Sequence, residues 1–541
     1  MSVDPSQPQP TPETASSWAA FRHGTFTALW CATVVSNIGT WIYNAASAWL
    51  MTSLQPNPLV VSLVQVATLL PLFLFALPGG VLADIVDRRK LLLVFQTAVA
   101  VIVTAFGIMV LADKVTPVIL LIVTFLIGTG SALIAPAWQS IVPQLVPKGA
   151  LQSAVAINSV GVNISRAIGP ALAGIIITTV GIAAPFFVDA VALLGVVAAL
   201  LLWKTPKQHT SRLPTERFWG AARNAFRHIG YNLHLRATLM RAIGSFVFAS
   251  AYWALLPLVV REQIGGGANL YGLLLGAIGV GAVVGAFALP WMKQKLGPDR
   301  LVAIGTVGTC AATALFGMAR QPSIALSASF LAGLAWISVL STMNVSAQVA
   351  LPDWVRARGL AIFVMVFNGA MTVGSVIWGQ LAATAGLPVA HFAAATGLIL
   401  AVPLTWRWKL QTGVGVNMAP SMHWPEPIVS HDIPFDRGPV MVMIEYRVDP
   451  RERDNFLTAI GELEYERRRD GGYDWHIFED AADDGRFVET FLIHSWEEHL
   501  RQHERVTGAD RIVQECVQRF HIVGKPPVTH LIAADTARVR E

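Results

Sequence analysis

Two charged residues lie inside long apolar stretches of the sequence, where an unpaired charge is costly. Arg166 lies in the stretch 152–179, and Asp189 lies near the start of the next stretch, 183–203. A guanidinium can bind an anion, and a carboxylate can carry a proton, so both residues are candidates for a substrate or proton pathway. At 1.5 Å per residue along a helix, their depths differ by roughly 12 Å. We therefore expect separate roles, with Arg166 facing a cavity and Asp189 nearer the outer end. The alternatives are a stretched ion pair, and for Asp189 a structural acid bonded to backbone or hydroxyl groups.

Neutral amides in the apolar stretches are further candidates for lining the same pathway. Each could equally form a hydrogen bond between two helices. The candidates are Asn37, Asn163, Asn344 and Asn368, together with Asn44 and Gln348.

Two short motifs combine residues suited to conformational change. The first contains Gly80, Asp84, Asp87, Arg88 and Arg89, so that acids and bases meet at one helix end. Ion pairs at such a place can hold neighbouring helices together and release them, as a gate requires. A short solvated turn is the alternative.

The second motif contains Gly161, Gly169, Pro170 and Gly174. Small residues let two helix backbones approach closely, and proline permits a local bend. These residues predict a helix-packing surface.

Residue patterns for catalysis, metals or nucleotides are weak. His499 and His503 have a spacing at which one helix can bind a metal ion. No HExxH pattern and no third ligand accompany them, so we expect a solvated helix face. The three cysteines form no closely spaced pair, and no GxxxxGK[ST] sequence occurs. We therefore predict no catalytic residue, no metal and no cofactor.

The elements that must position these residues are membrane-spanning helices. Apolar residues make up 54% of the sequence and charged residues only 13%, whereas a soluble domain has about 25% charged residues. A spanning helix needs about 20 mostly apolar residues. We predict twelve such helices, at 26–52, 59–82, 91–112, 117–137, 152–179, 183–203, 238–260, 270–292, 300–319, 323–349, 359–384 and 388–409.

The placement of Lys and Arg predicts the orientation in the membrane. If the N-terminus is inside, most of these residues fall at inner helix ends and in the connection 204–236, whereas the outer loops hold only Lys114, Arg261 and Arg320. Cytoplasmic loops collect positive charge, so both termini are predicted in the cytoplasm, in a multi-pass protein of the plasma or inner membrane. The bases lie at helix ends and not along one face, so no nucleic-acid partner is expected.

An internal repeat appears when the sequence is shifted by 205 residues. The shift aligns Gly128 with Gly333, Pro147 with Pro352, Asn163 with Asn368, Gly169 with Gly374, and Gly174 with Gly379. It predicts two six-helix halves, 21–203 and 237–410, related by a two-fold axis along the membrane normal with a substrate site between them. The Pro-rich and Gln-rich segment 1–20 is predicted to be a disordered tail.

A separate domain is predicted after the Pro-containing linker 411–436. In 437–541, the segment 439–448 alternates apolar and polar residues, as a half-buried strand does. A helix at 450–469, strands at 473–479 and 486–494, a helical region at 496–520 and a strand near 527–533 follow. This βαββαβ order predicts an α+β ferredoxin-like domain. It resembles small monooxygenases that work in pairs, so self-association through this domain is a further expectation.

The motifs resemble those of a known transporter superfamily. The segment 80–90 is similar to motif A of the major facilitator superfamily, in which the aspartate at Asp84 caps a neighbouring helix and gates the cytoplasmic side. Here Ile85 replaces a common base and Asp87 replaces a glycine, which puts the strength of the latch in question. The run from Gly161 to Gly174 resembles motif C, which marks drug-exporting branches.

Other segments narrow the resemblance to one branch. Segments 36–41, 167–170 and 255–257 look like the macrolide-efflux and enterobactin-exporter branch, and 495–505 resembles the hallmark of the domain fused to transmembrane secretion effectors. The resemblance implies a secondary transporter, not an enzyme, that exports a small drug-like or siderophore-like amphipathic molecule by alternating access. Its partners would be the substrate, protons and the lipid bilayer. The alternatives are a membrane-anchored enzyme or a ligand sensor acting through 437–541.

Overall fold

The computed structural model describes residues 19–203, 230–411 and 433–534 apart from Val523, with a few single residues between these ranges. Residues 1–18 of the predicted tail, most of the 204–236 connection and most of the linker lie outside the described residues. The last two residues of the predicted tail, Ala19 and Ala20, are ordered in a 3₁₀ helix, Ala19–Arg22. The chain forms two compact units. The first comprises Met1–Arg212, Met240–Met343 and Ala361–Arg407, and the second comprises Leu213–Leu239, Asn344–Leu360 and Trp408–Glu541.

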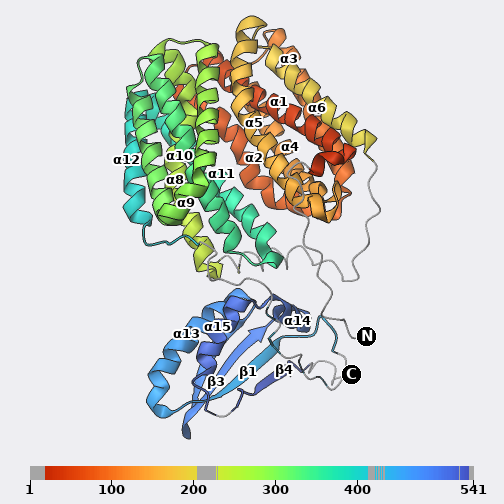
Figure 1. Cartoon of the computed structure of the whole chain (residues 1–541), viewed down its shortest axis with the longest axis vertical. Coiled ribbons are helices and arrows are strands. Elements are labelled where there is room, and N and C mark those ends of the chain that lie inside the picture. The colour runs from red at the N-terminus through yellow and green to blue at the C-terminus, as the bar shows by residue number, and fades with distance from the viewer. Residues whose placement is uncertain are drawn as a thin grey trace. The chain divides into compact units, whose positions relative to one another are not determined.

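The first six long helices form one bundle, coloured red to yellow in Figure 1. Proline begins α2 and α4, and the side chains of Asn57 and Thr116 cap these helices by accepting hydrogen bonds from backbone N–H groups. Proline suits a first helical position because its missing N–H would have no partner there. The helices are α1 (Gly24–Leu54), α2 (Pro58–Ile85), α3 (Arg88–Leu111), α4 (Pro117–Ile141), α5 (Leu151–Thr179) and α6 (Ala184–Leu202).

The later long helices form a second bundle, green to cyan in Figure 1. They are α8 (Leu233–Leu258), α9 (Ala268–Met318), α10 (Pro322–Val349), α11 (Asp353–Ala385) and α12 (Leu387–Thr405), and a π-helical turn, Val259–Ile264, follows α8. The backbone of α9 breaks at Gly297, where φ is 71° and ψ is 169°. Its 51 residues would measure about 77 Å as one straight helix, far more than a bilayer core of about 30 Å.

Each of the twelve apolar stretches falls mainly within one of these helices, and the stretches 270–292 and 300–319 share α9 on either side of Gly297. In the described residues, ten helices are long and apolar enough to cross a membrane, and α1 is not among them. The predicted membrane-helix class is therefore confirmed. The number of twelve spans stays a prediction.

Positions related by the 205-residue shift make related contacts. Asn163 Nδ2 donates to Ser159 O at 2.9 Å, and Asn368 Nδ2 donates to Val364 O at 2.7 Å. An ideal Cβ on Gly174 of α5 would lie 2.8 Å from Ala268 O of α9. A Cβ on Gly379 of α11 would likewise meet Ser62 of α2. Each half thus packs a glycine of its fifth helix against the second helix of the other half.

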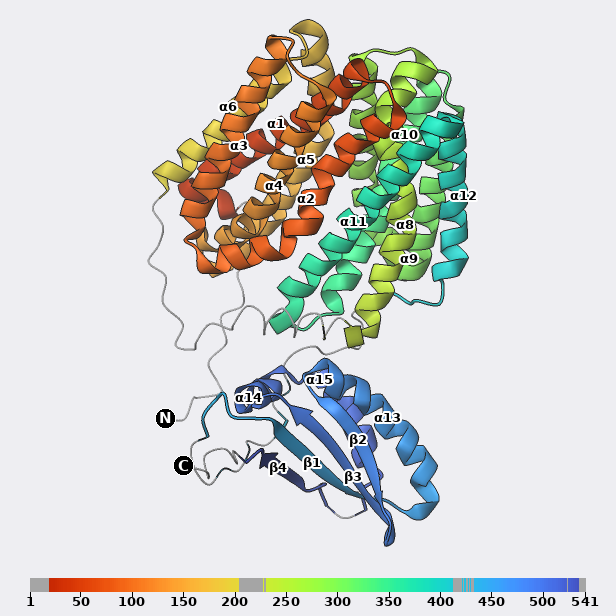
Figure 2. The same cartoon turned by 180° about the vertical axis from the view of Figure 1, so that it is seen from behind.

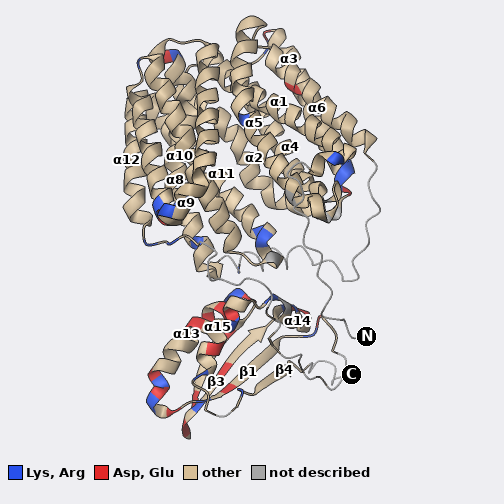
Figure 3. Cartoon of the chain, viewed as in Figure 1, with Lys and Arg blue, Asp and Glu red and all other residues tan. Residues whose placement is uncertain are grey.

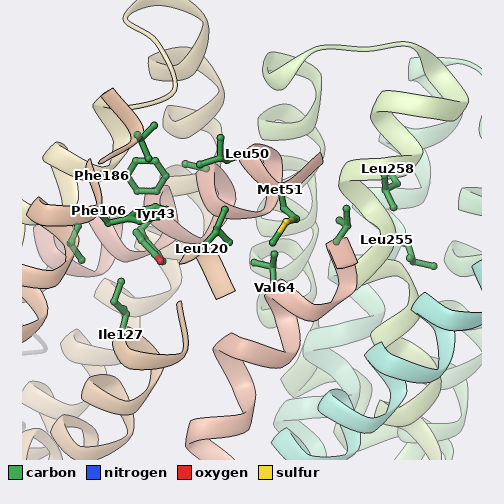
Figure 4. Packing of buried hydrophobic residues seen from close by; sticks show 14 of the residues in the cluster. Tyr43, Leu50, Met51, Val64, Phe106, Leu120, Ile127, Phe186, Leu255 and Leu258 are labelled. Atoms are coloured by element: carbon green, nitrogen blue, oxygen red, sulfur yellow. The ribbon is translucent and has the colours of Figure 1, made fainter. Parts of the chain in front are cut away.

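An apolar core ties the first bundle together. Phe186 of α6 lies edge-on to Tyr43 of α1 and Phe106 of α3, with centroid distances of 5.5 and 4.9 Å. Figure 4 shows these rings grouped together, with Leu120 and Ile127 of α4 nearby. The Tyr43 hydroxyl is hydrogen-bonded to Thr124 Oγ1 at 3.1 Å, so the polar end of its ring is satisfied. The same cluster extends through Val64 to Leu255 and Leu258 of α8.

The C-terminal domain is a four-stranded antiparallel sheet with helices. Its strand order is β2-β3-β1-β4, which can be followed in Figure 2. The elements are β1 (Val440–Arg447), α13 (Arg453–Arg469), β2 (Tyr473–Asp480), β3 (Asp483–Ile493), α14 (Trp496–Arg505), α15 (Gly508–Gln518) and β4 (Val528–Ile532). The ferredoxin-like prediction is confirmed. The helical region predicted at 496–520 consists of two helices, because Val506 is extended and Thr507 caps the start of α15 with a capping box.

Charge separates the membrane helices from this domain. Figure 3 shows Lys and Arg near the ends of the long helices, with tan residues over most of their length, whereas α13, α15 and the strands carry both signs. Such a pattern is typical of spanning helices joined to a water-exposed domain.

Candidate functional site

A cavity of about 310 Å³ lies among helices of both bundles. Its wall is mainly aromatic and aliphatic, with a few polar groups, as is usual for small-molecule sites. The lining residues come from α1, α2 and α5 on one side and α8 to α11 on the other. They are Trp41, Asn44, Ala45, Ala48, Val61, Val64, Gln65, Thr68, Leu69, Arg166, Pro170, Trp253, Ala254, Tyr271, Leu275, Trp336, Leu340, Phe367 and Met371.

Arg166 of α5 is the charged residue of this wall in the part of the chain that the structure describes. Its Cζ lies 5.6 Å from the ring centroid of Trp41, so the guanidinium rests on an aromatic face. Its Nε is buried, and no described residue accepts a hydrogen bond from it. The Nε1 of Trp253 is likewise buried without a partner among the described residues. Two unused donors in an apolar wall can bind an acceptor, above all a negatively charged oxygen.

Aromatic side chains form the facing part of the wall. Trp336 lies edge-on to Trp253 at 5.4 Å, and its ring centroid is 6.0 Å from that of Phe367. Asn44, Gln65 and Thr68 add neutral polar groups from α1 and α2. Such a wall suits a molecule with a flat apolar part and an anionic part.

The two bundles contact each other at helix ends that the Lys and Arg distribution predicts to lie outside. Arg261 Nη1 donates to Thr52 Oγ1 at 3.0 Å and to Ser53 Oγ at 2.7 Å. Trp49 stacks on Tyr271 with centroids 5.8 Å apart. We call these five residues the outer clasp. Tyr271 also lines the cavity, so the clasp adjoins the cavity wall.

Asp189 lies away from the cavity, in α6. Only 1% of it is exposed, and no described residue donates a hydrogen bond to its Oδ1. A Cβ built on Gly39 of α1 would lie 2.7 Å from that oxygen. The carboxylate therefore faces the backbone of α1, and only a glycine leaves room for it there.

The predicted amides also lie outside the cavity wall, except Asn44. Asn163 and Asn368 donate to carbonyls of their own helices. Asn344 accepts from Gln348 Nε2 at 2.6 Å. Asn37 is partly buried in α1 and does not line the cavity.

The charged motif at the end of α2 supplies helix caps. The side chain of Asp84 lies outside the described part of the structure. Asp87 caps α3 by accepting from the Lys90 N–H at 2.9 Å. Arg89 donates from Nε to Leu200 O and from Nη2 to Leu201 O, both at 2.8 Å. A cation at a helix C-terminus is favourable, so Arg89 ties α3 to the end of α6.

The other members of this motif make weaker contacts. Arg88 Nε donates to Ala83 O at 3.4 Å, and a Cβ on Gly80 would meet no atom within 4 Å. Gly80 thus leaves open space beside α2.

The small-residue motif of α5 connects the cavity to the packing of the bundles. Gly161 lies against Trp30 and Val34 of α1, and Gly169 lies against Trp41. Gly174 lies against α9, and Pro170 lines the cavity. A shift of α5 would therefore move the cavity wall together with the contact between the bundles.

Three histidines of the C-terminal domain lie together. His499 and His503 come from α14, and His530 comes from β4; one ring nitrogen of each lies within 4.8 Å of the others. Burial lowers the pKa of His499 to about 3 and that of His503 to about 4, so both rings are neutral at pH 7. The prediction of a solvated helix face is wrong for His499, which is 1% exposed. Sequence spacing could not identify His530, because strand pairing brings it there.

Long spanning helices in two related bundles, with a cavity between them, define a membrane transporter of the major facilitator type. The chain belongs to the transmembrane secretion effector family, whose model matches residues 15–539. It is 23% identical over 365 residues to the staphyloferrin A transporter of Staphylococcus aureus, a match that covers 65% of this chain and 87% of that protein. It is 26% identical over 326 residues to the enterobactin exporter EntS of Citrobacter koseri, with 59% and 76% covered.

Solved transporter structures share the fold. The nucleoside transporter NupG matches with a TM-score of 0.59 and 10% identity, covering 71% of this chain and 99% of that one. A bacterial homologue of the human lysosomal transporter Spinster, in an inward-facing and unoccupied conformation, matches with a TM-score of 0.53 and 15% identity, covering 72% and 97%.

Proposed function

We propose that this protein exports a small amphipathic molecule with negative charge, of the siderophore or anionic drug class, by alternating access. The observation that carries the proposal is Arg166, whose Nε has no partner among the described residues in an aromatic cavity. A buried cation without a counter-ion is costly, and an anionic substrate would supply that counter-ion. The names of the relatives, a staphyloferrin A transporter and an enterobactin exporter, agree with this class.

The driving force in this proposal is the proton gradient, with Asp189 as the group that carries the proton. Asp189 is buried and Oδ1 is unbonded among the described residues, so protonation removes a charge from an apolar site. Its place between α6 and α1 would couple that change to the packing of α1, which also lines the cavity.

The location in this proposal is the plasma or inner membrane, with both termini in the cytoplasm. The supporting observation is the concentration of Lys and Arg at the helix ends opposite the outer clasp. In this proposal the clasp joins the outer ends of the two bundles and closes the outer side. Asp84 remains our proposal for the cytoplasmic gate.

Everted membrane vesicles with an imposed pH gradient test this function. Vesicles that contain the full chain should accumulate iron-free enterobactin or staphyloferrin A when the gradient is present, and not after an ionophore collapses it. A chain cut after residue 436 should insert and still transport, since the helices form the cavity. If the cut chain is inserted but inactive while its separated C-terminal part converts a substrate in solution, the protein is a membrane-anchored enzyme and the proposal fails.

A further inference from the structure

The histidine cluster of the C-terminal domain lies outside the transport cavity and has no role in the proposed cycle. His499 is the buried member, and neither its Nδ1 nor its Nε2 has a hydrogen-bond partner among the described residues. A neutral imidazole carries one donor and one acceptor, and leaving both unmet in a buried site is costly. Gln502 is also buried beside His499, and neither atom of its amide makes a hydrogen bond of normal geometry with a described residue.

A buried charge elsewhere in the domain core is fully paired. Glu489 is fully buried, yet its Oε1 accepts from Arg467 Nε and from Trp475 Nε1, both at 3.0 Å. Its Oε2 accepts from the Tyr446 hydroxyl at 3.0 Å. The same fold therefore pairs a buried carboxylate completely while it leaves a buried imidazole unpaired. This difference leaves the ring nitrogens of His499 open to a ligand from outside the described residues.

The ring positions suit a ligand shared by the three histidines. The centroid of His499 lies 4.8 Å from that of His503 and 4.7 Å from that of His530. The three rings thus surround one point and do not form a stack. Their ligand nitrogens lie within 4.8 Å of one another. Two nitrogens bound to one Zn²⁺ are about 3.4 Å apart in a tetrahedral site, so adjustments of about 1 Å in side-chain position would bring all three to bonding distance.

We propose that His499, His503 and His530 bind one divalent transition-metal ion, with Zn²⁺ the best match and one coordination position left open. Imidazole suits Zn²⁺, Cu²⁺, Ni²⁺ and Fe²⁺, whereas Ca²⁺ and Mg²⁺ prefer oxygen ligands. Three protein ligands around Zn²⁺ leave a fourth position for water or for an added ligand. The site also fastens α14 to β4, so bound metal stabilises the packing of these two elements.

The metal-free full-length protein tests this site. The protein is purified in detergent with a tag that contains no histidine, treated with a chelator, and titrated with ZnCl₂ by calorimetry. We expect one Zn²⁺ per chain, and we expect Co²⁺ to give the visible absorption of a four-coordinate site. Zn²⁺ should also raise the temperature at which the C-terminal domain unfolds, because it binds only the folded site.

The variants are His499→Ala, His503→Gln and His530→Ala, with His476→Ala as the matched control. His476 lies in β2 of the same domain with its side chain 57% exposed, and it is not part of the cluster. Loss of a ligand should weaken Zn²⁺ binding at least about 100-fold, the most that loss of an outer-shell partner costs. The control should bind as the wild type does, and circular dichroism before metal addition establishes that each variant is folded.

Two results would overturn the proposal. In the first, the wild type shows no saturable Zn²⁺ binding. In the second, folded His503→Gln and His530→Ala variants bind Zn²⁺ as tightly as the His476→Ala control, which would assign the binding to surface histidines. Neither result depends on transport, so the site can fail while the proposed function stands.

Discussion

The two bundles bury charged residues in opposite ways. In the second bundle, Arg241 of α8 is 3% exposed, and its Nη1 lies 3.0 Å from Asp299 Oδ1 of α9. Its Nε also donates to Thr405 O at 3.4 Å. In the first bundle, Arg166 and Asp189 each keep a buried atom without a partner among the described residues.

The contrast separates charges that hold helices together from charges that are free to bind a ligand or a proton. A paired charge fastens helices, and removal of one partner leaves the other uncompensated. An unpaired charge inside an apolar region lowers stability and remains free to bind a ligand or a proton. The first bundle thus carries the charges that we assign to transport, while the second contributes a fastened frame and most of the aromatic wall.

Substitution of Arg166 should have the largest effect. Arg166→Gln removes the only cavity charge among the described residues, and we expect the transport rate to fall at least about 100-fold, since a charged hydrogen bond in a buried site contributes about 3 kcal/mol. Arg166→Lys keeps the charge and should retain part of the rate. Exposed Arg320, mutated to Gln, is the control. Rates are measured at equal membrane abundance, and a wild-type rate for Arg166→Gln would remove the distinction between the bundles.

Substitution of Arg241 should act on stability instead. Arg241→Ala removes the ion pair with Asp299 and the hydrogen bond to the end of α12, so we expect a loss of about 2 kcal/mol in unfolding free energy. Asp299→Asn should cost less, because Asp299 is 25% exposed. A double-mutant cycle followed by thermal unfolding in detergent measures the coupling. Additive losses would show that the pair does not fasten α8 to α9.

Substitution of Asp189 should change the response to the proton gradient. Asp189→Asn keeps the size of the side chain and removes the protonation step. We expect gradient-driven export to fall about tenfold, equivalent to about 1.4 kcal/mol, while exchange without a gradient changes less. Both assays use the same proteoliposomes over a range of pH. The same pH dependence in variant and wild type would assign Asp189 a purely structural role.

The smallest effect is expected in the C-terminal domain, where burial disfavours the charged form of an acid, Glu466. Burial, and then the nearby Asp510, raises the pKa of Glu466 to about 9. The folded state therefore holds a proton that the unfolded state releases above its ordinary pKa of 4.5. Stability from this group is complete below pH 4.5 and is lost as the pH rises toward 9.

Glu466→Gln should remove this dependence and raise the unfolding temperature of the domain at pH 8 by about 4 °C, equivalent to about 1 kcal/mol. Exposed Glu515, mutated to Gln, is the control. Differential scanning calorimetry at pH 5 and pH 8 gives the comparison. An equal fall in unfolding temperature between these pH values for variant and wild type would contradict the shift.

Sequence patterns predicted the elements better than they predicted which way side chains face. Twenty-residue apolar stretches and the alternation in 439–448 reflect burial that every spanning helix or half-buried strand needs, so the helices and the ferredoxin-like order followed from them. The sequence did not predict the cavity wall. In an apolar helix, Trp253, Trp336 and Phe367 cannot be distinguished from residues that face lipid or pack between helices. Asp189 faces α1 because Gly39 leaves room there. That contact depends on how each helix is oriented about its own axis, which the sequence does not record. His530 joins α14 through strand pairing, which no local spacing records.

The central claim is that Arg166 recognises the negative charge of the transported molecule. The most direct measurement compares an anionic siderophore with its neutral ester in proteoliposomes that contain either the wild type or Arg166→Gln. We predict that the wild type transports the anion at least tenfold faster than the ester, and that this preference disappears in the variant while ester transport stays within about twofold. An unchanged preference for the anion in Arg166→Gln would contradict the account, because some other group would then read the charge.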